Sequence, residues 1–144
     1  MKKSTKIRID IAACIVVLIV AFFLRSVSVH DRITKELGTS DYDVVCIEEM
    51  IEHDMTVVDI TKPEDKEAVI AALQEAKARF VKLESSTEFQ AALYTLTVSS
   101  GEESMSLTVD QNNRIHINTA EKTYAVTNGS DLYQALQQVF EHYR

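Results

Sequence analysis

The chain has 144 residues, of which 46% are hydrophobic and 26% are charged, and its formal net charge is −7. Three glycines and one proline exclude a low-complexity or linker-like protein, and the length is that of a single globular domain. The acidic balance argues against nucleic acid as a partner, because an acidic surface repels phosphate backbones.

The N-terminal residues combine a basic tip with an apolar run. Four Lys or Arg side chains lie within residues 2–8, and residues 11–24 carry no charge. That run has 14 residues, whereas a helix that crosses about 30 Å of hydrocarbon needs about 20. If apolar neighbours on both sides extend it, the pattern predicts a transmembrane signal anchor over residues 1–24, with its N-terminus in the cytoplasm. The side chains expected to face lipid include Ile7, Ile11, Cys14, Leu18, Phe22 and Leu24.

Two other fates of this segment stay open. Ser26-Val27-Ser28 offers small residues for cleavage, and the protein would then be secreted. Ile11-Ala12-Ala13-Cys14 is similar to a lipidation site, but in lipoproteins the apolar run precedes the cysteine, and here it follows. The expected location is therefore a cell membrane, crossed once, with the C-terminal domain outside.

The exported part is strongly acidic. Residues 25–144 carry eleven basic and twenty-one acidic side chains, which leaves cationic peptides, divalent metals or a basic face of another membrane protein as partners. Cys46 is the only cysteine in this part, so an intramolecular disulfide is excluded there. Its apolar neighbours indicate a core side chain, and a reactive or intermolecular thiol is the alternative.

Residues 25–41 show no clear periodicity and are expected to form a stalk, or a helix carried on from the membrane. A folded domain is expected over residues 42–144. Residues 42–50 and 55–60 are rich in β-favouring side chains and predict a hairpin, although residues 43–53 also fit a short helix.

A helix is predicted to begin after Thr61, the expected capping residue, because Pro63, Glu64 and Asp65 suit a first helical turn. Its apolar face is expected to run on to about residue 84. The residues of that face are Val69, Leu73, Ala76, Phe80 and Leu83.

The apolar period changes to two from about residue 92. Four strands near residues 94–98, 105–109, 115–117 and 124–126 predict an antiparallel meander with a solvated Ser/Thr face. A last helix is expected after Asp131. The order ββαββββα therefore predicts an α+β fold with a sheet of five to six strands and two helices on one face.

Three features together carry a resemblance. They are the basic anchor, the strand over residues 56–61 that leads into Lys62-Pro63-Glu64-Asp65, and Lys122-Thr123-Tyr124-Ala125-Val126 before the last helix. In these features the chain resembles the small membrane-anchored or secreted α+β ectodomains of Gram-positive bacteria, many of them domains of unknown function. The resemblance implies a location and a fold type, and it carries over no catalytic residue.

No Gly-x-Ser-x-Gly, His-Glu-x-x-His, phosphate-binding loop or Cys-x-x-Cys motif occurs in the sequence. The densest polar cluster is residues 48–54. On a helix, Glu49, Glu52 and His53 would be close enough to bind zinc or another divalent ion, whereas on a hairpin they would be a solvated turn. His116 is expected on the polar face of the sheet, and residues 110–113 in a hairpin turn.

Two functions follow as expectations. The first is a non-enzymatic, membrane-tethered module, without a cofactor, that binds an envelope protein or a peptide through its polar sheet face or an edge strand. The second is a metal-binding or metal-dependent envelope enzyme that uses Glu49, Glu52 and His53.

Overall fold

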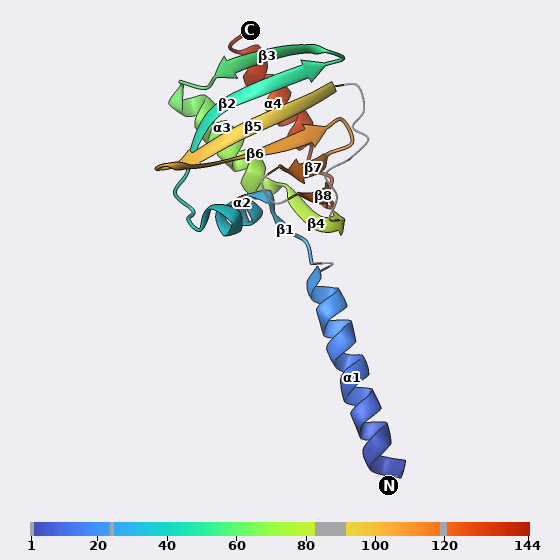
Figure 1. Ribbon diagram of the computed structural model, residues 1–144. Coiled ribbons are helices and arrows are strands. Elements are labelled where there is room, and N and C mark those ends of the chain that lie inside the picture. Colours follow the sequence, from blue (N-terminus) through green and yellow to red (C-terminus); the bar gives the residue numbers. More distant parts are fainter. Residues whose placement is uncertain (1, 24, 83–91, 119–120) are drawn as a thin grey trace.

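The computed structural model describes residues 2–23, 25–82, 92–118 and 121–144, and it confirms the α+β class. Within these residues, one antiparallel sheet has eight strands in the order β1-β4-β8-β7-β6-β5-β2-β3 (Figure 1). The helices are α1 (Lys2–Phe23), α2 (Val29–Leu37), α3 (Pro63–Glu75) and α4 (Leu132–Glu141). The strands are β1 (Val27–Ser28), β2 (Asp43–Ile51), β3 (Asp54–Asp59), β4 (Lys77–Lys82), β5 (Ala92–Ser100), β6 (Glu103–Asp110), β7 (Arg114–Ile117) and β8 (Lys122–Val126).

Several predicted elements are confirmed. β2 and β3 form the expected hairpin, so the alternative helix over residues 43–53 is wrong. β5, β6, β7 and β8 pair in sequence as an antiparallel meander. Asp131 caps α4 as expected, because its side chain accepts a hydrogen bond from the Gln134 N–H.

The prediction of five to six strands is wrong, because it missed β1 and β4. The helical spacing that predicted one long helix continues past the point where α3 ends, at Glu75. The end of α3 is held by a distant loop: Asn128 donates to the Glu75 carbonyl at 2.8 Å and accepts the Lys77 N–H at 3.2 Å. The chain then becomes β4, which pairs with β8.

The stalk expected over residues 25–41 is instead part of the folded domain. β1 pairs with β4, and α2 follows with Ser28 as its cap and Gly38 in the left-handed conformation at its end. Val29, Ile33 and Leu37 lie on one face of α2 and are buried in the core. Their spacing of four is a helical period, so the expectation that residues 25–41 show no clear periodicity is wrong.

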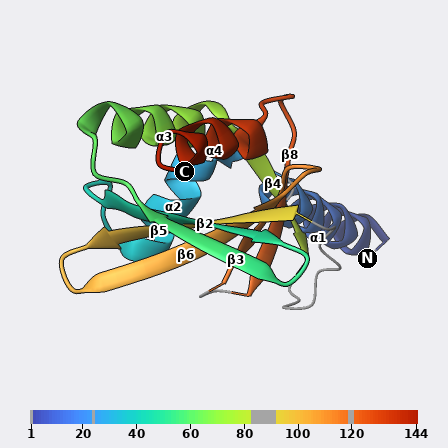
Figure 2. The same cartoon turned by 90° about the horizontal axis from the view of Figure 1, so that it is seen from above.

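α3 and α4 lie side by side over one face of the sheet, and α2 packs against α3 at the end of that layer (Figures 1 and 2). The core fills the space between this helix layer and the sheet. Its fully buried side chains include Ile47 of β2, Leu96 of β5, Leu107 of β6 and Phe140 of α4. The opposite side of the sheet, which we call the helix-free face, carries no described helix.

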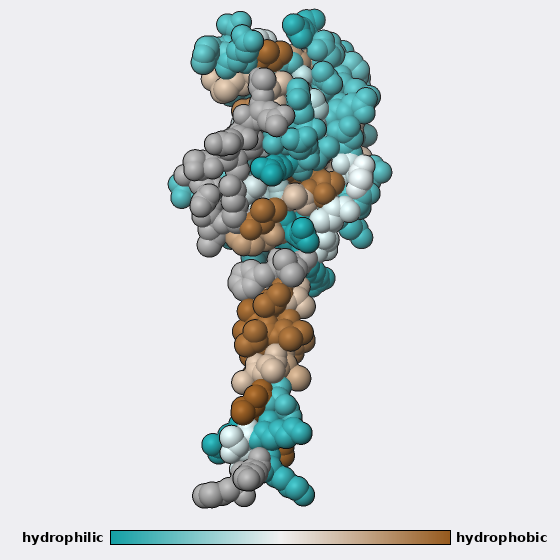
Figure 3. Space-filling model, turned by 90° about the vertical axis from the view of Figure 1, so that its right-hand side faces the viewer, coloured by the Kyte–Doolittle hydropathy of each residue, from teal (hydrophilic) through white to brown (hydrophobic). Residues whose placement is uncertain are grey.

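The prediction of a transmembrane helix is wrong: no helix of the described residues is long and apolar enough to cross a membrane. Every 18-residue stretch of α1 contains Lys6, Arg8 and Asp10. Figure 3 shows that the half of α1 nearer the domain is apolar and the far half is mostly polar. Of the residues expected to face lipid, Leu24 lies outside the described residues, and the others are exposed: Ile7, Ile11, Cys14, Leu18 and Phe22.

Candidate functional site

The structure separates the three residues of the predicted metal site. Glu49 lies on the helix-covered face of β2 and is only 7% exposed, whereas Glu52 and His53 form the exposed turn after β2. Glu52 has a φ of 56°, the left-handed conformation that tight hairpin turns require. The described residues contain no group of three or more His, Cys, Asp or Glu side chains that could hold a metal ion.

Glu49 instead belongs to a buried contact between the sheet and α4. Its Oε2 atom accepts a hydrogen bond of 2.5 Å from the Tyr94 hydroxyl, and its Oε1 atom lies 3.8 Å from Arg144 Nη1. The Tyr94 ring packs against the rings of Tyr133 and Phe140. Burial and the hydrogen bond to Glu49 raise the pKa of Tyr94, so its hydroxyl remains a donor at neutral pH. This contact joins β2, β5 and α4.

Replacing Tyr94 with phenylalanine should lower the free energy of unfolding by about 1–2 kcal/mol, because the buried Glu49 carboxylate loses its donor. Urea unfolding at pH 7 measures the change. Tyr133→Phe, which removes a hydroxyl from the neighbouring half-buried ring, is the matched control. Equal stabilities of the two variants would show that Glu49 does not depend on this donor.

The start of α3 is closed by the end of α4. Lys62, at the capping position, makes no side-chain capping bond, so the expected cap at Thr61 is wrong. The Tyr143 hydroxyl accepts the N–H groups of Lys62 and Thr61 at 2.9 and 3.3 Å. One residue earlier, His142 Nδ1 lies 2.8 Å from Oδ1 of Asp65, which is buried in the first turn of α3.

Asp65 is held in its charged form by these neighbours. Burial alone would raise the pKa of Asp65, but the hydrogen bond to His142, the nearby Tyr143 hydroxyl and the charges of His142 and Lys62 outweigh burial and lower it. Its Oδ2 atom is buried and has no partner in hydrogen-bond geometry among the described residues, although Tyr143 is close enough to affect the pKa. Asp65 and His142 therefore tie α4 to α3.

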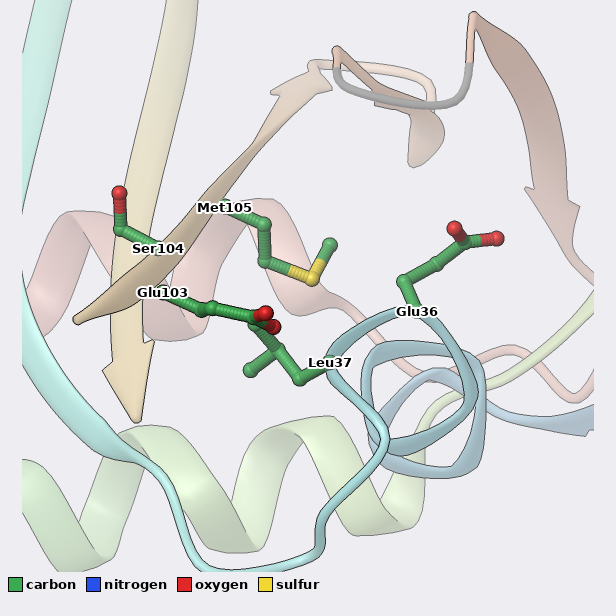
Figure 4. A pocket seen from close by; sticks show the side chains of 5 residues that line it. All are labelled: Glu36, Leu37, Glu103, Ser104 and Met105. Atoms are coloured by element: carbon green, nitrogen blue, oxygen red, sulfur yellow. The ribbon is translucent and has the colours of Figure 1, made fainter. Parts of the chain in front are cut away.

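The two larger surface hollows described for residues 2–23, 25–82, 92–118 and 121–144 do not have the features of an active site. One, of about 270 Å³, lies between the end of α2 and the start of β6. Figure 4 shows Glu103 extending towards Leu37 and Glu36 pointing away from Glu103, and Glu36 pairs with Lys122 at 3.5 Å. The other, of about 560 Å³, lies between α3 and α4 beside Asp65 and His142. Neither lining places a serine or cysteine beside a histidine.

The middle of the helix-free face is a buried polar layer, so the expectation of a solvated Ser/Thr face is wrong there. Thr108, His116 and Thr123 lie in one row across three strands and are at most 7% exposed. His116 Nδ1 lies 3.2 Å from the Thr123 hydroxyl, and the hydroxyls of Thr95 and Thr108 are 3.0 Å apart. Burial lowers the pKa of His116. The hydroxyl and imidazole groups of this layer therefore form hydrogen bonds with one another.

The turn predicted over residues 110–113 is confirmed as a hairpin turn. The buried Asp110 accepts the N–H groups of Asn112 and Arg114, both at 2.9 Å. These bonds use the carboxylate to hold the backbone of the turn. These two hydrogen bonds of the Asp110 carboxylate are therefore made within its own turn.

The open part of the sheet is its β3 side. β3 is the last strand in the sheet order, and among the described residues no strand pairs with its outer side, which we call the β3 edge. On the helix-free face, Met55 and Val57 of β3 are 57% and 53% exposed. Met55 lies opposite Met50 of β2, which lies opposite Leu93 of β5, so an apolar row crosses three strands. Half-buried Cys46 is on the same face rather than in the core.

The hairpin of β2 and β3 is also strongly acidic. Residues 43–59 carry six acidic side chains and no lysine or arginine. Asp43 pairs with Lys66 at 2.9 Å, and Glu49 is buried. The other four, which form no ion pair among the described residues, are Glu48, Glu52, Asp54 and Asp59.

An edge strand was expected as a binding element, but the sequence did not indicate which strand. The β-favouring side chains of residues 55–60 predict a strand, yet such side chains also occur in central strands. A further signal, which the sequence-based expectations did not use, is the absence of lysine and arginine from residues 43–59. Comparison of the chain with protein families, with curated proteins and with solved structures found no match.

Proposed function

We propose that the chain is a non-enzymatic interaction module that binds an extended segment of another protein as an additional strand along the β3 edge. Two observations carry the proposal: no strand pairs with the outer side of β3 among the described residues, and Met55 and Val57 of β3 itself are exposed. An extended peptide added to a sheet edge gains main-chain hydrogen bonds, and alternate side chains then contact one face of the sheet.

The backbone of β3 supports this mode of binding. The Ile60 N–H donates to the Val45 carbonyl at 2.9 Å, so Ile60 bonds towards β2. Along a strand of an antiparallel pair, the backbone N–H and C=O groups of successive residues point alternately towards the partner strand and away from it. Met55, Val57 and Asp59 consequently direct their N–H and C=O groups outwards, along six residues of regular strand.

The β3 edge carries charge at Asp54 and Asp59, but it lacks other protections that are usual for an edge strand. Natural edges are blocked by lysine, proline, a bulge or a very short strand. β3 contains neither lysine nor proline, and the register shift in β2 lies on the side of β2 that pairs with β5. At the other end of the sheet, the two residues of β1 cover the first residues of β4. The β3 edge is therefore the better place for an added strand.

A library of random peptides displayed on phage, selected on the full chain, tests the proposal. We expect the selected peptides to slow amide hydrogen exchange at Met55, Val57 and Asp59, and to lose at least about tenfold in affinity for Val57→Pro, because proline removes an outward N–H. Val57→Thr is the matched control and should bind normally.

Proline at residue 57 leaves the hydrogen bonds to β2 in place, so the thermal unfolding of Val57→Pro should stay close to that of the parent chain. A folded Val57→Pro chain that binds the same peptides equally well would contradict strand addition at this edge.

A further inference from the structure

We infer that the segment bound at the β3 edge is basic, with lysine or arginine side chains beside apolar residues that cover Met55 and Val57. This inference rests on the proposed function and specifies the chemistry of the partner. The acidic and the apolar side chains that an added strand would contact indicate these two properties of the partner.

Four carboxylates surround the β3 edge. Asp54 and Asp59 stand at the two ends of β3 and are exposed, and Glu52 lies in the exposed turn. Glu48 lies opposite Val57 on the neighbouring strand. Opposite charges on adjacent strands attract and like charges repel, so a partner strand with basic side chains gains at both ends of β3.

An apolar row crosses the sheet beside these charges. Met55, Met50 and Leu93 lie in register across β3, β2 and β5 on the helix-free face. Met55 and Val57 are more than half exposed, whereas Met50 and Leu93 are half-buried. A partner strand that places apolar side chains on this face would extend the row and remove Met55 and Val57 from water.

The same charges make a second copy of this chain an unfavourable occupant. Pairing of β3 with β3 of another copy would bring the Asp54 and Asp59 carboxylates of both copies to the same edge. The hairpin offers no lysine or arginine to offset them. Like charges directly opposite each other destabilise strand pairs, so the charges oppose edge-to-edge dimers and leave the edge open to a cationic strand.

Four synthetic peptides and the full chain test the inference. In three of them valine alternates with lysine, with serine or with glutamate, and in the fourth proline replaces the valines of the lysine peptide. Titration calorimetry at two salt concentrations measures each affinity. We expect the lysine peptide to bind most tightly and less tightly at high salt, the glutamate peptide not to bind, and the proline peptide to lose binding, because proline cannot add a strand.

Variants that remove the charge of a single carboxylate show which side chains attract the lysine peptide. Asp54→Asn and Asp59→Asn should each weaken binding of the lysine peptide roughly two- to fivefold and leave the serine peptide unchanged. The matched control is Glu67→Gln, which, like each aspartate variant, removes one negative charge, here from an exposed position on α3. This control should bind the lysine peptide as the parent does.

The outcomes separate the inference from the function on which it rests. Equal binding of the lysine and serine peptides, both abolished by Val57→Pro, overturns the basic partner and keeps strand addition. The same holds if the control variant weakens binding as much as the two aspartate variants. Binding that Val57→Pro leaves intact, or no binding of any peptide, overturns the proposed function together with the inference.

Discussion

Replacing Ile33 with alanine should lower the free energy of unfolding by about 3–4 kcal/mol. Ile33 is fully buried in α2, between Val29 and Leu37, and it joins the core formed by the sheet and the other helices. Removal of three methyl or methylene groups from such a site costs their transfer free energy and leaves a cavity. Urea unfolding of the full chain, followed by circular dichroism, measures the loss.

The matched control is Ile9→Ala on α1, where the isoleucine is 63% exposed and its loss should have little effect on the domain. If Ile33→Ala costs less than about 1 kcal/mol, residues 25–41 behave as the stalk that their sequence first indicated. A large loss shows that any fragment intended to fold has to include α2.

Asp65→Asn should lower the free energy of unfolding by about 2 kcal/mol at pH 7, because it removes a buried charge that is hydrogen-bonded to His142. The pKa of Asp65 is lower in the folded protein than in the unfolded chain, where it is about 3.9. The folded state then binds fewer protons than the unfolded state as the pH falls. The stabilisation is complete above the unfolded pKa and is lost as the pH falls through the folded value.

The stability difference between the parent chain and Asp65→Asn should therefore shrink as the pH falls below about pH 4. Urea unfolding over a range of pH values measures it. Glu64→Gln, an exposed carboxylate one residue earlier, is the control and should show no such pH dependence. A difference that persists unchanged at pH 2 would show that the charge of Asp65 does not contribute to stability.

Local sequence signals predicted the elements that depend on local chemistry. The hairpin of β2 and β3, the meander from β5 to β8, the start of α3 at Pro63 and the cap of α4 at Asp131 each have their signal within a few residues. The end of α3 has no such local signal. Helical spacing continues through Phe80, and only Asn128, about 50 residues later, holds the carbonyl of Glu75 and turns the chain into β4.

The candidate sites also depend on contacts that local sequence signals do not reveal. The sequence grouped Glu49 with Glu52 and His53 because they are close in the chain. The pleat of β2 directs Glu49 under α4 to Tyr94, and the turn leaves Glu52 and His53 in solvent. The edge position of β3 was not predictable, because a strand carries the same alternation whether one or both of its sides are paired.

Composition and side-chain pattern indicated an acidic α+β chain, showed that residues 43–59 carry no lysine or arginine, and predicted a meander followed by a helix. Composition and side-chain period carry this information, and both are local properties. Only the folded structure shows that α2 belongs to the core, that β1 and β4 complete the sheet, and that no other described strand pairs with the outer side of β3. Strand order and helix ends depend on contacts between residues far apart in the chain, and such contacts have no local signal.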